Sequence, residues 1–198
     1  MKKPYGISGL QYNRTLRQRK IMKKLDRTVP RILLVLSVLS INLVLDRVTK
    51  YFAVEFLRGK DQISLFWNSI VLEYAENTGA FLSLGNNWPV SIKIITFLIV
   101  PLLFCVLAII YCLVKETDPI RNILITTIAS GGIANLYDRI FNSFHVIDFL
   151  NFGIGAVRTG ILNIADMSVT FGVIFLIFYE YRLYSYVIKN KKTNNLEY

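Results

Sequence analysis

Long apolar segments separated by short polar breaks dominate the pattern of this 198-residue chain. Segments of about 20 apolar residues are long enough to cross a lipid bilayer as helices. Asp46 and Arg47, not a small-residue cleavage site, interrupt the first segment, which disfavours a cleaved signal peptide. Pro101 should kink the second segment, and the small residues at 129–134 should let the third pack closely. The pattern predicts four spans, at about 31–54, 89–114, 120–140 and 163–184.

The two longer connections between the predicted spans differ in their residue patterns. In the first, Ile70–Tyr74 and Ala80–Leu84 are typical of strands, and Asn77-Thr78-Gly79 is a turn signal. We therefore expect a small hairpin-like platform outside the membrane. Phe66, Trp67 and Trp88 should lie near it at the level of the lipid headgroups. The second connection, 141–162, is apolar and punctuated by glycines, and we expect it to be a loop.

Composition and charge agree with a membrane protein. Hydrophobic residues make up 54% of the chain and charged residues only 18%, fewer than in most soluble domains. The net charge is +10, but ten Lys and Arg and a single acid lie within 1–31. Such a tail favours a cytoplasmic N-terminus in contact with anionic lipids, and it does not indicate nucleic-acid binding.

The expected organisation has three parts. Residues 1–30 form a basic cytoplasmic tail, disordered or lying on the membrane surface. Residues 31–188 form a single membrane-embedded domain, and 189–198 form a cytoplasmic C-terminal tail. With four spans both termini are cytoplasmic, so Asp46, Asp138 and Asp166 meet at the outer face.

The segment from His145 to Asp166 contains the candidate chemistry. Carboxylates at the edge of a bilayer are costly, so Asp148 and Asp166 indicate function. Asn163 suits an N-cap, which places Asp166 in a first helical turn where its ionised form is favoured. Apolar neighbours should desolvate Asp148 and favour its protonated form. Two carboxyls in opposed environments predict acid–base chemistry on water, as in an aspartic peptidase.

Other polar residues are spaced to share helix faces. Asp46 and Lys50 are four apart, which predicts an ion pair at the membrane interface. Asn135, Asp138 and Arg139 lie on one face of the third span, where we expect Asp138 and Arg139 to form a structural pair, with Asn135 and Arg139 also near substrate. The two cysteines, Cys105 and Cys112, are expected to be apolar core residues, and no metal or cofactor site is indicated.

Five segments, in order, resemble the lipoprotein signal peptidases, the type II signal peptidases of bacteria. They are Leu45-Asp46-Arg47-Val48-Thr49-Lys50, Asn77-Thr78-Gly79-Ala80-Phe81, Gly131-Gly132-Ile133-Ala134-Asn135-Leu136-Tyr137-Asp138-Arg139, Val146-Ile147-Asp148-Phe149 and Asn163-Ile164-Ala165-Asp166.

The resemblance implies an all-α membrane protein, a four-transmembrane-helix bundle with a small extracytoplasmic β-cradle at about 60–87. It implies an aspartic endopeptidase of the bacterial cytoplasmic (inner) membrane that cuts diacylglyceryl prolipoproteins before the lipidated cysteine, without a cofactor. The expected catalytic dyad is Asp148 and Asp166. The supporting residues implied are Asp46, Lys50, Asn77, Gly79, Asn135, Asp138, Arg139 and Asn163.

A monomer and inhibition by globomycin-type compounds are also expected. Two other functions stay open at this point. One is a divergent paralogue that binds lipidated peptides without cutting them, and the other is a proton-coupled membrane transporter. The clustering of the acids at one membrane face and the lack of a repeated half argue against the transporter.

Overall fold

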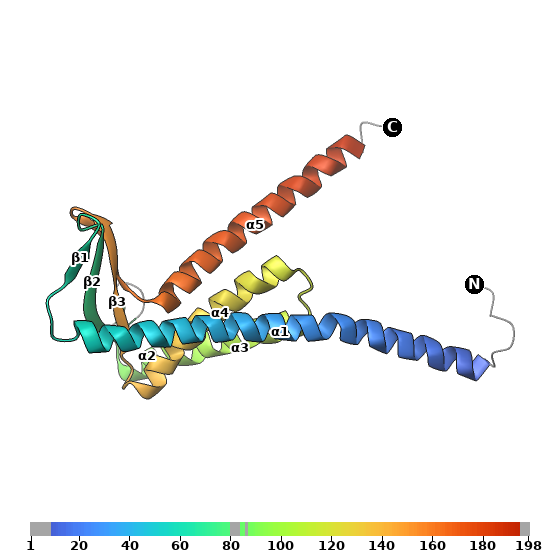
Figure 1. Ribbon diagram of the computed structural model, residues 1–198, viewed down its shortest axis with the longest axis horizontal. Coiled ribbons are helices and arrows are strands. Elements are labelled where there is room, and N and C mark those ends of the chain that lie inside the picture. The colour runs from blue at the N-terminus through green and yellow to red at the C-terminus, as the bar shows by residue number, and fades with distance from the viewer. Residues whose placement is uncertain (1–8, 80–83, 86, 195–198) are drawn as a thin grey trace.

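The computed structural model describes residues 9–79, 84–85 and 87–194, with side chains described over 28–79, 84–85 and 87–188. It is a helical bundle with a small antiparallel sheet at one end (Figure 1). In chain order the elements are α1 (Gly9–Leu57), β1 (Ile63–Leu65), β2 (Ile70–Asn77), α2 (Val90–Ile94), the π-helical turn η2 (Ile95–Ile99), α3 (Val100–Val114), α4 (Pro119–Phe141), β3 (Val146–Ile154), β4 (Val157–Leu162) and α5 (Ile164–Asn194).

Three helices in the described part of the chain are long and apolar enough to cross a membrane: Thr28–Leu57, Val90–Val114 and Ile164–Ile188. The third predicted span, at about 120–140, corresponds to the 23-residue helix α4, which is not among these three helices. Helix α4 contains the polar residues Asn122, Thr126 and Ser130, which are buried, and it is therefore less apolar than the other three helices. The structure is thus a mostly helical membrane protein with a small sheet.

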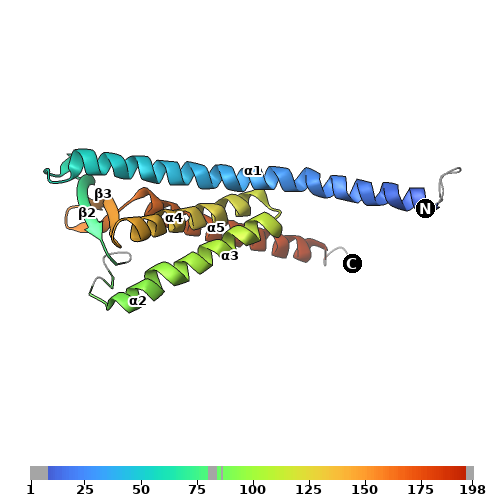
Figure 2. The same cartoon turned by 90° about the horizontal axis from the view of Figure 1, so that it is seen from below.

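Helix α4 is central in the bundle, since α1, α3 and α5 each pack against it (Figure 2). A Cβ atom at Gly131 would lie 2.5 Å from the carbonyl oxygen of Ala165, and one at Gly172 would lie 2.7 Å from Ile128. Both glycines therefore allow α4 and α5 to approach closely, and the predicted small-residue face is confirmed. The contact at Gly131 holds the first turn of α5 against α4.

The irregularity expected at Pro101 is a π-helical turn. Proline has no N–H to donate to the carbonyl group of Phe97, four residues earlier. Directly before it the helix widens over Ile95–Ile99, and the N–H of Val100 donates to the carbonyl of Ile95, five residues back. The turn contains Phe97, which is buried.

The sheet has the strand order β1-β2-β3-β4, and all neighbours are antiparallel. The predicted strand Ile70–Tyr74 is confirmed as part of β2, which pairs with β1 and β3. Of the second predicted strand, Ala80–Leu84, all but Leu84 lies outside the described residues, and Leu84 is in a turn. The sheet therefore spans 63–77 and 146–162, and the cradle boundaries of about 60–87 include only half of it.

The expectation of a loop over 141–162 is wrong. Strands β3 and β4 occupy 146–154 and 157–162, joined by a turn in which Gly155 adopts a φ of +57°. The apolar and β-branched residues of this segment favour strands once a partner is available. That partner is β2, which is more than 60 residues away in sequence, and the pairing sets Asp148 opposite Ala75.

One apolar cluster joins the sheet to α1, and a second joins α3 to α4. Ala53 and Leu57 of α1 pack against Phe149 of β3, and Cys105 of α3 packs against α4. Both cysteines of the chain are buried free thiols, which confirms their prediction as core residues. The strand that carries Asp148 is thus fixed to the end of α1.

Helix α1 begins at Gly9, so the expected tail is helical over 9–30, in line with the first span, and the prediction of disorder is wrong there. Lys, Arg, Gln and Leu favour helix, and neither Gly nor Pro occurs between 10 and 29, so the helix can extend from the apolar span. The start of α1 and the end of α5 lie at the opposite end of the molecule from the sheet (Figure 1).

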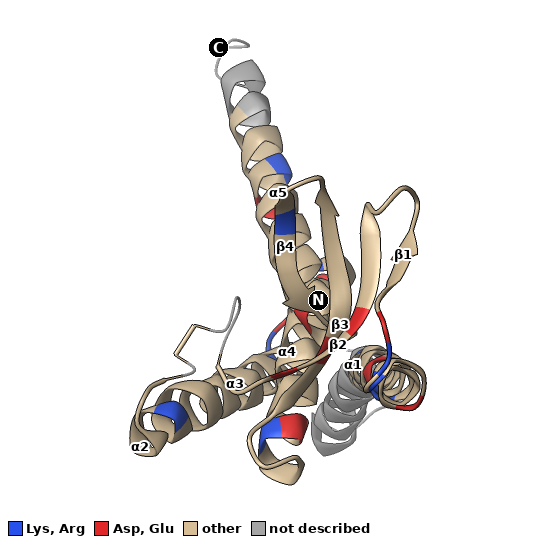
Figure 3. Ribbon diagram, turned by 90° about the vertical axis from the view of Figure 1, so that its left-hand side faces the viewer, with Lys and Arg blue, Asp and Glu red and all other residues tan. Residues whose placement is uncertain are grey.

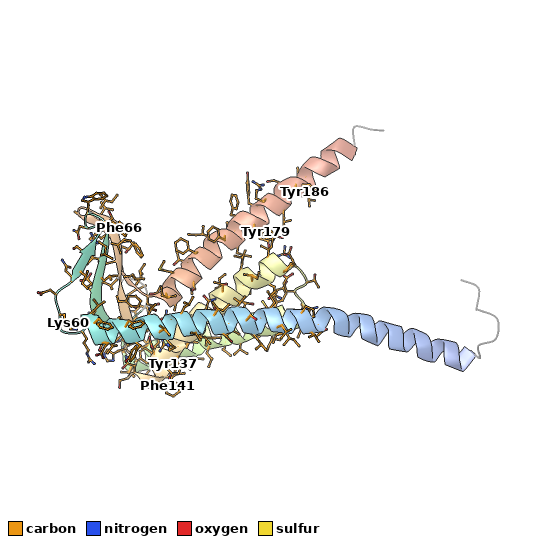
Figure 4. All side chains as sticks on the ribbon, viewed as in Figure 1. Lys60, Phe66, Tyr137, Phe141, Tyr179 and Tyr186 are labelled. Atoms are coloured by element: carbon orange, nitrogen blue, oxygen red, sulfur yellow. The ribbon has the colours of Figure 1, made fainter. Side chains whose placement is uncertain are left out.

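Aromatic side chains lie at both ends of the molecule. Phe66 lies in the β1–β2 turn at the far tip of the sheet, beside Trp67, which is 99% exposed (Figure 4). Tyr179 and Tyr186 lie on α5 toward the opposite end (Figure 4). Two such groups, one at each end of apolar helices, are typical of the two membrane interfaces.

Candidate active site

Two carboxylates from different elements line one cavity of about 500 Å³. Asp148 lies in β3 and Asp166 in the first turn of α5. Viewed from the sheet end, acidic and basic residues occur where α1 and α4 reach the sheet (Figure 3). The rest of the cavity wall mixes apolar and polar residues: Asn77, Gly79, Phe97, Pro101, Gly132, Asn135, Leu136, Arg139, Val146, Ile161, Leu162, Val169 and Thr170.

Asp148 is buried, with a side chain that accepts two amide hydrogen bonds. Asn163 Nδ2 donates to Oδ1 at 2.6 Å, and Asn77 Nδ2 donates to Oδ2 at 3.3 Å. Burial and the neighbouring charge of Asp166 raise the pKa of Asp148 to about 7, although the two amides oppose the rise. Asp148 therefore keeps its proton to a higher pH than an ordinary aspartate does.

Asp166 and Asn163 form a reciprocal cap at the start of α5. The backbone N–H of Asp166 donates to Asn163 Oδ1 at 2.9 Å, and the N–H of Asn163 donates to Asp166 Oδ2 at 3.2 Å. This arrangement is a capping box, and it confirms Asn163 as the predicted N-cap. The cap fixes Asp166 while its other oxygen, Oδ1, accepts a bond from Asn135 Nδ2 at 2.8 Å.

The amide of Asn135 has only one orientation that suits its neighbours. Its Oδ1 accepts from Lys50 Nζ and from Asn163 Nδ2, both at 3.1 Å. An ammonium group can only donate, so Oδ1 must face Lys50 and Nδ2 must face Asp166. Lys50 thus fixes the orientation of the Asn135 amide in which Nδ2 donates to Asp166.

Four charged side chains form a cluster beside the carboxylates, in which Asp46, Lys50 and Asp138 are buried and Arg47 is partly exposed. Lys50 Nζ lies 3.0 Å from Asp46 Oδ2 and 2.8 Å from Asp138 Oδ2. Arg47 pairs with the same two acids, at 2.6 Å from Asp46 Oδ2. The predicted pair of Asp46 and Lys50 is confirmed, and both of its side chains are buried inside the protein.

The expected pair of Asp138 and Arg139 is wrong, because Asp138 is paired instead with Arg47 and Lys50. Asp138 faces α1, whereas Arg139 faces the cavity and donates to the carbonyl oxygens of Asn135, at 3.3 Å, and Gly79, at 2.7 Å. Its Nε is buried without a partner among the described residues. The N–H of Gly79 donates to Asn77 Oδ1 at 2.9 Å, so Arg139, Gly79 and Asn77 are linked.

Arg47 was not predicted as a site residue. Asp46 was expected to pair with Lys50 and Asp138 with Arg139, so the predicted charges balanced without Arg47. Because Arg47 and Asp138 are 91 residues apart, no local pattern in the sequence indicates their pairing. Within the described residues, no group of three or more His, Cys, Asp or Glu is arranged to hold a metal ion.

The sequence is similar to that of known proteins over almost all of this architecture. The family model described as "Signal peptidase (SPase) II" matches residues 38–182. The chain belongs to the signal peptidase II family. Signal peptidase II is a protease, and the matched range includes both cavity carboxylates and the charged cluster.

Relatives of this chain include the "Lipoprotein signal peptidase" of Borrelia turicatae (strain 91E135). It is 36% identical over 161 residues, which is 79% of this chain and 91% of the relative. The protein of the same name from Borrelia duttonii (strain Ly) has the same identity and coverage. These bacterial relatives and the apolar helices make the chain a bacterial inner-membrane protein.

The fold of this chain is also found in solved structures. A chain described as "Bacterial membrane enzyme structure by the in meso method at 2.3 A resolution" has a TM-score of 0.65 and 22% identity, and the match covers 75% of this chain and 87% of that one. A second, at 1.9 Å, has a TM-score of 0.61.

Proposed function

We propose that this chain is an aspartic endopeptidase that removes signal peptides from diacylglyceryl-modified prolipoproteins, cutting before the lipidated cysteine. Asp148 and Asp166 are its catalytic dyad. The observation that supports this most directly is that two carboxyls with unlike surroundings line one cavity in a member of the signal peptidase II family. The names of the Borrelia relatives support the substrate class.

The dyad divides acid and base roles between two environments. Asp166, which accepts hydrogen bonds from Asn135 and from the backbone at the start of α5, acts as the ionised base and takes a proton from water. Asp148 holds the other proton and donates it toward the scissile carbonyl oxygen as the water oxygen attacks the carbonyl carbon. Collapse of the tetrahedral species breaks the C–N bond, and the amine leaves with a proton returned from the dyad.

The cavity wall suits an extended, lipid-modified peptide. Phe97, Leu136 and Val169 offer apolar surface for acyl chains, while the dyad side offers polar groups to the peptide backbone. Arg139, held by Gly79 and Asn135, is the cation closest to where a substrate carbonyl or ester oxygen would bind. Both carboxyls come from one chain, so the active unit is a monomer.

The arrangement in the membrane follows from the helices. At 1.5 Å per residue, α4 is about 34 Å long, enough for a hydrocarbon core of about 30 Å, and it serves as the fourth span. The basic start of α1 stays in the cytoplasm with the C-terminus. The sheet and the dyad are then at the outer face, where the lipidated cysteine of a secreted precursor also lies.

The test uses purified protein in detergent micelles and a diacylglyceryl prolipoprotein, with the same precursor lacking the lipid as control. We expect a size shift for the lipidated precursor only, and none with Asp148→Asn or Asp166→Asn. The double variant should be no worse than either single variant, since both changes stop the same step. Binding of the lipidated precursor without any cleavage by the parent would instead favour the non-cleaving paralogue.

A further inference from the structure

The charged cluster formed by Asp46, Arg47, Lys50 and Asp138 has connections beyond its own ion pairs. Asp46 Oδ1 accepts a hydrogen bond from the backbone N–H of Ala165 at 3.1 Å. Asp138 Oδ2 accepts one, at 3.4 Å, from a second backbone N–H, that of the residue before Asp148. Each acid of the cluster therefore holds a backbone segment of another element.

Both of these backbone N–H groups belong to the residue directly before a carboxylate of the dyad. Ala165 immediately precedes Asp166, and Ile147 immediately precedes Asp148. One acid of the cluster thus fixes the start of α5, and the other fixes the start of β3. The separation between Asp46 and Asp138 is consequently coupled to the separation between the two carboxyls of the dyad.

Arg47 is the side chain best suited to fix that separation. One terminal nitrogen of its guanidinium binds Asp138, and the other binds Asp46 at 2.6 Å. A rigid planar group with two donors sets the distance and angle between two carboxylates, whereas an ammonium group sets only proximity. The guanidinium carbon lies 4.7 Å from the ring centre of Tyr137, which helps to hold its plane.

We propose that Arg47 is a positioning residue that sets the distance between the two catalytic carboxyls through Asp46 and Asp138. This inference rests on the proposed function of the dyad. Arg47 itself is outside the cavity lining, so it does not touch the reacting atoms. Its effect is to hold Ala165 and Ile147, and with them the dyad, at a working separation.

The experiment compares Arg47→Gln and Arg47→Lys with the parent, using Arg182→Gln as the control. Arg182 is an exposed arginine on α5 whose guanidinium carbon lies 5.8 Å from the ring centre of Phe178. The assays are kcat and KM for the diacylglyceryl prolipoprotein, the pH–rate profile, the melting temperature, and amide hydrogen exchange at Ile147 and Ala165.

We expect kcat of Arg47→Gln to fall about 10- to 100-fold, the cost of a displacement of about 1 Å in a catalytic group, with KM little changed. The pH–rate profile should become narrower. When the two carboxyls are held less firmly they interact less, so their two apparent pKa values lie closer together. Exchange at Ile147 and Ala165 should rise. Arg47→Lys retains the charge but not the two-donor fork, so its kcat should recover only in part.

A stable Arg47→Gln with parental kcat and an unchanged pH profile would overturn the proposal. If Arg47→Gln fails to fold, Arg47→Lys decides: reduced kcat at a parental melting temperature supports positioning, and parental kcat refutes it. If the parent does not cleave, the proposed function fails. In that case amide exchange at Ile147 and Ala165 in Arg47→Lys still tests the positioning role of Arg47. Faster exchange than in the parent supports that role, and unchanged exchange overturns it.

Discussion

Replacing Asp148 with asparagine should abolish cleavage and yet stabilise the folded protein at alkaline pH. Burial and the charge of Asp166 raise the pKa of Asp148 from its ordinary value of 3.8 to about 7. Between about pH 4 and pH 7 the folded chain therefore binds a proton that the unfolded chain releases. The free energy of unfolding falls as the pH rises through this window, and above it the parent bears the full cost of an ionised buried carboxyl.

The size of the effect follows from the same values. A difference of about three pH units corresponds to about 4 kcal/mol at about 1.4 kcal/mol per unit, which is an upper limit. The single oxygen of asparagine can accept from only one of Asn163 and Asn77, and its NH2 group then faces the other amide. Two donors lose an acceptor in this way, at a cost of about 1 kcal/mol each. The net gain for Asp148→Asn should therefore be about 2 kcal/mol at pH 8, and it should vanish or reverse near pH 4.

Denaturant titration in detergent micelles at pH 4, 6 and 8 measures this directly. Asp118→Asn is a matched control, because the hydrogen bond from Tyr179 lowers the pKa of Asp118 and the same substitution should not stabilise the protein at any of these pH values. An Asp148→Asn variant that is less stable than the parent at pH 8, with the difference independent of pH, would refute the assignment of a raised pKa.

Three further predictions test other parts of the structure. A topology reporter after Tyr198 should be cytoplasmic and one inserted near Gly59 should be outside; a cytoplasmic signal near Gly59 would reverse the proposed orientation. Gly131→Ala should lower the melting temperature and kcat together, costing about 1–3 kcal/mol, because the new Cβ would lie 2.5 Å from the backbone oxygen of Ala165; parental values of both would contradict the close packing. Asn163→Ser and Asn163→Ala should both move the alkaline limb of the pH–rate profile to higher pH, because each removes the Asn163 donor that lowers the pKa of Asp148. Serine should retain about 1 kcal/mol more stability than alanine, because it can still act as an N-cap. An alkaline limb that does not move would exclude this donor from the mechanism.

Local features of the site could be predicted because they depend on residues close in sequence. The cap formed by Asn163 and Asp166 has the spacing of a capping box, and the pair of Asp46 and Lys50 has that of one helical turn. The small-residue face around Gly131 was also readable, since only small residues allow two helices to approach so closely.

Features that depend on distant partners could not be predicted in this way. Strand β3 has apolar residues on both faces and is flanked by spans, so periodicity alone does not separate it from a loop until β2 pairs with it. Arg47 and Asp138 are 91 residues apart, and no local pattern shows that they bind each other. The helical start of α1 was missed for another reason, because high charge was given more weight than helix propensity.

The charges near the cavity balance only if the dyad holds one proton. Asp46 and Asp138 are neutralised by Arg47 and Lys50, so that cluster contributes no net charge. The remaining cation that lines the cavity, Arg139, can balance one further carboxylate but not two. In a poorly solvated site an uncompensated charge is costly, so the state with one ionised and one protonated carboxyl is favoured. The same groups that hold the dyad in place therefore also favour the protonation state that an acid and a base acting together require.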